Sequence, residues 1–257
     1  MEIKLKKLQS IINAHSDLDE IKSSIKTGIK DLDKLLPIQN GNLVLIGSRS
    51  GMGKTSLAVQ IAANSSLYSN KAVAYFSIEL TEAEVTRRIL AHRNIPDIES
   101  IPLYINDHGS ISTEEIYEEA KKLKEEKGLS LIIVDYLQLI KGDKEERLEE
   151  QTARKVTDLK NVARSLDCPL ILLAQLSRGL EGRSDRRPVL TDFRESGTIE
   201  QTADLVIFIY RDDFYNPNSP EIGIAELRVA KNKITGKIGL IKALWDKVSL
   251  SFKNLTI

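Results

Sequence analysis

The chain has 257 residues, and its 37 Lys and Arg residues balance 37 Asp and Glu residues, so the formal net charge is zero. This length, without a Pro-, Gly- or Ser-rich linker, predicts one α/β domain with an N-terminal extension. The charge balance excludes a global attraction to nucleic acid or membranes, so any DNA contact must be local. A charged N-terminus and an apolar run interrupted by Asp135 argue against export and membrane spanning, which predicts a cytoplasmic protein with no membrane partner.

Apolar runs alternate with amphipathic stretches along most of the chain. The first 36 residues are predicted to hold a short basic helix and a second helix, DLDKLL. Hydrophobic periodicity then predicts strands at 43–46, 72–78, 130–134, 169–174 and 204–210, and helices at 54–68, 82–92, 113–127 and 147–166. This alternation is typical of a parallel sheet covered on both faces.

Local signals support several of these boundaries. Capping boxes begin two helices, with Thr81 and Glu84 in one and Ser112 and Glu115 in the other, and Gly128 is a plausible helix stop. After residue 221 the segments IAELRVA, GLIKALW and VSLSFKNL predict antiparallel strands at one sheet edge, with a turn around residues 235–239. The lone Cys168 precedes an apolar run and is predicted to be a small buried hydrophobe in a reducing compartment.

The run LVLIGSRSGMGKTSLAVQIAA, residues 43–63, combines an apolar strand, a glycine-rich turn and a helix start. Backbone N–H groups of such a turn bind phosphates, so we expect a nucleoside triphosphate, with Lys54 on the outer phosphates and Thr55 on Mg²⁺. The strict phosphate-loop motif has its first glycine at the position of Ser48. In this chain the glycine stands one residue earlier, at Gly47. A glycine-rich surface turn is the alternative. The expected nucleotide-binding residues of the loop are Ser48, Arg49, Ser50, Gly51, Met52, Gly53, Lys54, Thr55 and Ser56.

Three polar residues follow other predicted strands, where ligands of open parallel sheets lie. Asp135 is expected to hold the Mg²⁺ shell, although an Asp at a strand end is also a common turn former. Glu79 is placed to orient the attacking water, with helix capping near Thr81 as the alternative. The Gln175 amide is expected to touch the γ-phosphate, and by itself a Gln at a strand end would be unremarkable.

Residues 176–197, LSRGLEGRSDRRPVLTDFRESG, form an arginine-rich stretch that we call the arginine segment. Arginine clusters of this kind bind the backbone of single-stranded nucleic acid, but they also occur on solvated rims and subunit contacts. Further on, Lys231 and Lys233 in AKNKITGK have two interpretations. They protect an exposed edge strand, or they reach the nucleotide of a neighbouring subunit in the manner of an arginine finger.

Together, the motifs GSRSGMGKT, YFSIEL, LIIVDYLQLI, LLAQLSRGLEGR, DRRP, DFRESGTIEQTADLVIFIYRDD and AKNKITGKIG resemble the ATPase domain of DnaB-type replicative DNA helicases in order and spacing. The resemblance covers the chain from about Ile25 onward. It implies an N-terminal extension or linker helix at 1–24 and a RecA-like phosphate-loop ATPase domain at 25–257. It also implies a mostly parallel sheet flanked by helices, with an antiparallel C-terminal edge.

The resemblance implies an ATP- and Mg²⁺-dependent hexameric ring that translocates 5′ to 3′ on single-stranded DNA, with ATP between subunits. A helicase loader is a candidate partner. The family usually carries an N-terminal helical domain that recruits primase, and only some thirty residues precede the ATPase core here, so primase binding is not inferred from the resemblance. Two rival functions stay open: a RecA-like recombination or repair ATPase without processive unwinding, and a non-hydrolysing nucleotide-binding subunit of a helicase assembly.

Matching positions carry roles across from the family. Lys54, Glu79 and Gln175 correspond to its phosphate-binding, catalytic and sensor residues, and Thr55 and Asp135 to its metal-side residues. Lys231 and Lys233 correspond to the trans-acting pair, of which the second is ordinarily Arg; a Lys there lacks the planar fork. Arg211 joins the expected nucleotide-binding residues. The expected DNA-binding residues are Arg178, Arg183, Arg194, Glu195 and Gly197.

Overall fold

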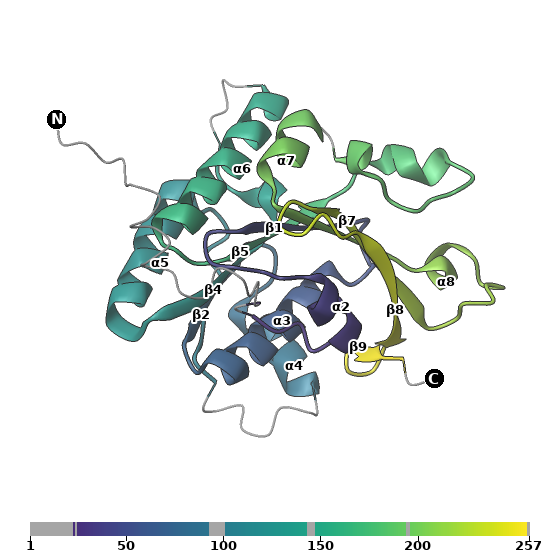
Figure 1. Ribbon diagram of the computed structural model, residues 1–257, viewed down its shortest axis with the longest axis horizontal. Helices are drawn as coiled ribbons and strands as arrows, with labels where there is room; N and C mark the ends of the chain where they lie inside the picture. The colour runs from purple at the N-terminus through teal and green to yellow at the C-terminus, as the bar shows by residue number, and fades with distance from the viewer. Residues whose placement is uncertain (1–22, 24, 93–100, 143–146, 194–195, 256–257) are drawn as a thin grey trace.

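A computed structural model describes residues 23, 25–92, 101–142, 147–193 and 196–255 (Figure 1). The predicted basic helix and most of the predicted extension, residues 1–22 and 24, lie outside this range, as do Arg194 and Glu195. None of the helices in the described ranges is long and apolar enough to cross a membrane.

Within these ranges, nine strands form one sheet in the order β3-β2-β4-β5-β1-β6-β7-β8-β9. The parallel part consists of β1 (Leu43–Ser48), β2 (Ala72–Ser77), β3 (Leu103–Asn106), β4 (Leu129–Asp135), β5 (Leu170–Gln175) and β6 (Leu205–Tyr210). The antiparallel part consists of β7 (Ile224–Asn232), β8 (Gly239–Asp246) and β9 (Ser251–Asn254). The expected mostly parallel sheet with an antiparallel C-terminal edge is confirmed.

Helices cover both faces of the sheet, as Figure 1 shows. One face packs against α5 (Thr113–Lys127), α6 (Leu148–Ser165) and α7 (Ser196–Thr202), and the other against α2 (Lys30–Leu35), α3 (Lys54–Ser69) and α4 (Glu82–Ala91). The central strands β1, β5 and β6 are apolar runs buried on both sides, since side chains alternate between the two helical layers. Short elements complete the described fold: η2 (Leu137–Leu139), η3 (Arg178–Gly182), η4 (Leu190–Asp192) and α8 (Asp212–Tyr215).

Most predicted boundaries agree with the structure to within two residues. Both capping boxes form, and Gly128 ends α5 with a positive φ. Strand β1 continues two residues past its predicted end because its pairing with β5 extends to Ser48 and Gln175. The sequence interpretation missed β3, which is only four residues long, and α7, which begins at the end of the polar arginine segment. Cys168 is buried, and burial raises the pKa of its thiol to about 12, in agreement with the predicted small hydrophobe.

Candidate functional site

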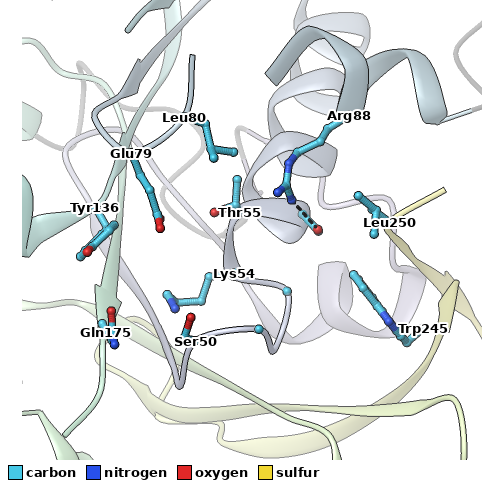
Figure 2. A pocket seen from close by; sticks show the side chains of 13 residues that line it. Ser50, Lys54, Thr55, Glu79, Leu80, Arg88, Tyr136, Gln175, Trp245 and Leu250 are labelled. Carbon is cyan, nitrogen blue, oxygen red and sulfur yellow. Dashed lines mark hydrogen bonds between the residues drawn. The ribbon is translucent and has the colours of Figure 1, made fainter. Parts of the chain in front are cut away.

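A pocket of about 320 Å³ lies where the carboxyl ends of the parallel strands meet the start of α3 (Figure 2). Its size falls within the range of small-molecule sites. The lining brings together loop residues, strand-end residues and side chains from α4 and the C-terminal strands: Ser50, Gly51, Gly53, Lys54, Thr55, Ser56, Glu79, Leu80, Arg88, Tyr136, Gln175, Trp245 and Leu250. Eight of these thirteen are predicted site residues.

The turn between β1 and α3 has the backbone that a phosphate loop needs. Gly51 and Gly53 have φ values of 78° and 103°, a left-handed region that other residues rarely adopt. A Cβ atom at Gly53 would lie 2.8 Å from the Phe252 ring, so the C-terminal strands also require glycine there. Helix α3 begins at Lys54, and its unpaired N–H groups and positive dipole end face the pocket.

The early glycine of the motif has a packing explanation. A Cβ at Gly47 would lie 2.7 Å from the Phe193 ring of the arginine segment, which leaves no room for a side chain. Ser48, in contrast, is buried as the last residue of β1, and its hydroxyl donates to the Arg49 carbonyl at 2.8 Å. The shifted glycine therefore serves the contact with Phe193, while the serine fits the start of the turn.

Lys54 and Glu79 point toward each other across the pocket in Figure 2. Lys54 donates to the carbonyl oxygens of Ser48 and Arg49 at 3.4 and 3.5 Å. Burial lowers the pKa of the Lys54 ammonium, and the nearby carboxylates of Asp135 and Glu79 oppose that shift. Glu79 is exposed and takes no part in the cap of α4, which Thr81 and Glu84 form, so the capping alternative for Glu79 is wrong.

Asp135 ends β4 and is buried, and the next residue, Tyr136, lines the pocket. Its Oδ2 accepts a hydrogen bond from the Tyr75 hydroxyl at 2.9 Å, whereas Oδ1 is buried and has no partner within the described residues. Burial raises the pKa of this carboxyl, against the effect of the Thr55 and Tyr75 hydroxyls. A buried carboxylate oxygen without a hydrogen-bond partner in the described part of the chain, beside the Thr55 hydroxyl, supplies the kind of oxygen ligands that Mg²⁺ prefers. The residues present therefore fit the expected metal.

Gln175 ends β5 and lines the pocket, and a neighbouring residue fixes its backbone. The Gln138 side chain donates to the Gln175 carbonyl at 3.0 Å and accepts from its N–H at 3.1 Å. Gln175, Tyr136 and Arg178 are among the residues that line a second cavity of about 170 Å³. The strand end thus connects the loop pocket to the arginine segment. Gln138 was missed because an amide within an apolar motif gives no sequence signal of its partner.

Several predicted nucleotide-binding residues lie beside the pocket without lining it. Met52 is buried in the core, and the Arg49 side chain turns away from the pocket. Arg211 is buried, pairs with Asp213 at 3.2 Å and lies 4.9 Å above the Trp245 ring. Arg211 therefore supports the aromatic wall of the pocket, with a long bond of 3.5 Å to the Gly51 carbonyl.

Of the described arginines in the arginine segment, three are held by partners. Arg183 pairs with Asp192 at 2.8 Å, Arg186 donates to the Glu181 carbonyl, and Arg187 makes two bonds to Glu226 on β7. Arg178 is exposed and makes no hydrogen bond or ion pair with another described residue. Gly197, in the first turn of α7, is exposed too. The segment presents Arg178 outward, whereas Arg183 stabilises the segment itself.

Lys231 and Lys233 lie far from this chain's own pocket. Because β7 runs antiparallel to β6, Lys231 pairs with Val206 near the start of β6, and the Lys233 N–H donates to the Asp204 carbonyl. The pocket lies at the other end of the parallel strands, about 13 Å away along β6. Both ammonium groups donate to backbone carbonyls of α7, at Glu200 and Gln201.

The interpretation of these lysines as edge protection is wrong. Strand β7 lies inside the sheet, between β6 and β8, and the sheet edges are β3 and β9. The alternating pattern of residues 221–257 predicts strands but not their order in the sheet. That order depends on tertiary contacts, which the pattern does not encode.

The model of the DnaB-like helicase C-terminal domain family matches residues 24–96 and 92–254. The chain is 36% identical over 259 residues to the replicative DNA helicase DnaB of Geobacillus stearothermophilus and 35% identical to the replicative DNA helicase DnaC of Bacillus subtilis. Each alignment covers 91% of this chain and 57% of the relative. The chain thus spans little more than half the length of these relatives.

Solved structures show the same fold. A DnaB-like replicative helicase, studied with its interactions with primase, superposes with a TM-score of 0.85 at 28% identity, covering 99% of this chain and 68% of the other. A second solved structure, of an ATPase domain, gives 0.85 at 29% identity, with 97% of each chain covered. The RadB recombinase gives 0.63 at 17% identity, covering 90% of this chain and 100% of the other, a likeness of fold alone. The RecA-like architecture expected from the motifs is confirmed.

Proposed function

Since this chain belongs to the DnaB-like helicase C-terminal domain family, we propose that it is the motor of an ATP-dependent replicative DNA helicase. The proposed assembly is a hexameric ring that translocates 5′ to 3′ on single-stranded DNA, with ATP between subunits. The observation that carries the proposal is the one pocket that Lys54, Thr55, Glu79 and Gln175 line together at the carboxyl ends of the parallel strands.

The chain's own residues supply one half of the reaction site. The N–H groups at the start of α3 and the Lys54 ammonium bind the phosphates and stabilise negative charge on the transferred group. Glu79 orients the attacking water and accepts its proton, so that ATP yields ADP and phosphate. Thr55 and Asp135 Oδ1 would hold Mg²⁺, which supplies positive charge at the phosphate oxygens. The Gln175 amide contacts the γ-phosphate.

The second half comes from a neighbouring subunit. Lys231 and Lys233 lie at the opposite end of the sheet from this chain's pocket, so they can serve only another copy's nucleotide. In a ring, every subunit presents its pocket to one neighbour and its lysine pair to the other. Two ammonium groups are point charges, and the pair stabilises the γ-phosphate without the bidentate bonds that an arginine would form.

The DNA-contacting residue that the structure favours is Arg178. It is exposed, it follows the γ-phosphate contact Gln175 by three residues, and it borders the cavity that adjoins Gln175. A guanidinium in that place binds the phosphate backbone of a single strand with an affinity that falls with salt. Arg194, Glu195 and Gly197 remain further candidates by family position.

The hydrolytic role of Glu79 is tested by Glu79→Gln. We expect the ATPase rate to fall by about 100-fold or more, because the amide cannot accept the proton, while a fluorescent ATP analogue still binds. Glu82→Gln is the matched control, since Glu82 is an exposed acid on the first turn of α4. An unchanged rate in Glu79→Gln would favour the non-hydrolysing subunit instead.

Unwinding is tested with the wild-type chain on forked duplexes that carry either a 5′ or a 3′ single-stranded arm. The proposal requires ATP-dependent displacement that depends on the 5′ arm. DNA-stimulated ATP hydrolysis without any displaced strand would favour the RecA-like recombination ATPase.

A further inference from the structure

The side chain of Arg49 leaves the phosphate loop and binds the arginine segment. Its Nε donates to Glu181 Oε1 at 2.7 Å, and its Nη1 donates to the Leu176 carbonyl at 2.9 Å. The Arg49 side chain is only 10% exposed, while that of Glu181 is 43% exposed. A guanidinium buried to this degree needs its partners, because an unpaired buried charge is strongly unfavourable. The contact therefore ties two functionally distinct segments together.

On the nucleotide side, the same residue is linked to Lys54. The Arg49 carbonyl oxygen is one of the two acceptors of the Lys54 ammonium, and Ser50, the next residue, lines the pocket. A bound triphosphate offers Lys54 a charged acceptor in place of these carbonyls. Nucleotide binding thus changes the hydrogen bonding of the peptide that carries the Arg49 side chain.

On the other side, the link ends at Arg178. Glu181 and Arg178 lie in the same short helix, η3, so a displacement of Glu181 moves Arg178. The segment is also attached to the end of β1, since the Leu176 N–H donates to the Ser48 carbonyl at 3.1 Å. The ion pair between Arg49 and Glu181 is thus a side-chain contact that joins the phosphate loop to η3.

We propose that Arg49 and Glu181 are positioning residues that couple nucleotide binding in the pocket to single-stranded DNA binding at Arg178. This inference rests on the proposed function. In thermodynamic terms, the affinity for DNA differs between the ATP-bound and ADP-bound states by a coupling factor, and DNA changes the relative nucleotide affinities by the same factor. The Arg49–Glu181 ion pair accounts for a measurable part of this coupling factor.

The test measures the coupling factor in wild type and Glu181→Gln. Binding of a fluorescein-labelled oligothymidylate is followed by anisotropy with Mg²⁺ and either ADP or a non-hydrolysable ATP analogue. The coupling factor is the larger of the two Kd values for DNA divided by the smaller in the wild type, and the same quotient is taken for each variant. We expect Glu181→Gln to reduce this ratio by at least about threefold. The nucleotide affinity without DNA should stay within about twofold, because Glu181 does not line the pocket.

Asp185→Asn is the matched control. Asp185 is another exposed acid of the arginine segment, and it contacts Arg187 and not the phosphate loop. Its coupling factor should equal that of the wild type. Arg49→Lys retains the positive charge but loses the planar guanidinium with its several N–H donors. It should therefore lower the coupling factor as Glu181→Gln does.

The outcomes separate the two proposals. A wild-type ratio of one, or no DNA binding, overturns the proposed function and the coupling with it. A wild-type ratio above one that Glu181→Gln leaves unchanged overturns only the role of the pair. An equal reduction of the coupling factor in Asp185→Asn also overturns the role of the pair, since the effect would then follow from the charge of the segment.

Discussion

The two carboxylate oxygens of Asp135 have different surroundings, and one hydroxyl causes the difference. Tyr75 is fully buried in β2 and donates to Oδ2, and this bond holds the carboxylate in one orientation with Oδ1 unpartnered among the described residues. Burial and the adjacent Asp135 raise the pKa of the Tyr75 hydroxyl well above its usual range, so it remains a donor at neutral pH. Groups that orient a metal ligand in this way contribute to metal affinity.

We therefore expect Tyr75→Phe to weaken Mg²⁺-dependent nucleotide binding by about tenfold, since Asp135 would lose the bond that fixes it. The measurement is a Mg²⁺ titration of fluorescent ADP binding, supported by Mn²⁺ binding followed by electron paramagnetic resonance. Tyr104→Phe is the control, because Tyr104 lies opposite Ala74 on the adjacent edge strand β3 and is exposed. Identical metal dependence in both variants would contradict the role of Tyr75.

At the scale of elements, β7 and α7 connect the lysine pair to the arginine segment. Strand β7 is antiparallel to β6, and this direction places Lys231 and Lys233 against the carbonyls of Glu200 and Gln201 near the end of α7. Helix α7 follows directly from the arginine segment. The residues proposed to act on a neighbour's nucleotide thus contact the same element that continues from the proposed DNA-binding residues.

This arrangement predicts a pH dependence. Burial and the neighbouring Lys233 lower the pKa of Lys231 to about 8, and Glu200 and Asp204 act in the opposite direction. Below about pH 8 the Lys231 ammonium is charged and, in the proposed assembly, would bind the neighbour's phosphate, whereas the neutral amine present above that pH could not. We expect the steady-state ATPase rate of the assembled protein to fall as the pH rises above about 8.

Lys231→Arg should move that fall in rate to higher pH, because a guanidinium stays protonated. Lys237→Arg, at an exposed lysine of the turn after β7, is the control and should keep the wild-type profile. If Lys231→Arg and the wild type lose activity over the same pH range, another group is responsible.

For the whole molecule, the sheet separates the two halves of the proposed site. Glu79 and the phosphate loop lie at the carboxyl ends of the parallel strands, and the lysine pair lies at their amino ends. One chain cannot bring both to the same nucleotide without unfolding the sheet. The proposed shared site therefore requires assembly for hydrolysis.

Mixed assemblies test this requirement. Glu79→Gln and Lys231→Ala should each be inactive alone, whereas a 1:1 mixture should recover about a quarter of the wild-type ATPase rate, since random mixing in a ring pairs an intact Glu79 with an intact Lys231 at that share of interfaces. Lys231→Ala mixed with Lys231→Ala,Glu79→Gln is the control and should stay inactive. No recovery in the first mixture, with assembly shown by mass measurement, would contradict a shared site.

The motifs allowed the parallel sheet, its two helical layers and the pocket-lining residues Lys54, Thr55, Glu79 and Gln175 to be predicted. These features are local: hydrophobic periodicity defines each strand, and ligand-binding residues follow strand ends directly in the chain. The glycines of the phosphate loop are likewise readable, because a tight turn restricts φ at fixed positions.

The tertiary structure decided which side chains meet across long sequence separations. Trp245 reaches the pocket from a strand almost 200 residues beyond the phosphate loop, Tyr75 finds Asp135, and Arg49 finds Glu181. It also gave each described arginine of the arginine segment a partner or left it exposed, and it placed β7 inside the sheet. The sequence by itself determined which chemical groups stand at each strand end. The contacts between them were determined by strand order and packing, because the contacting residues are far apart in the chain and no local pattern links them.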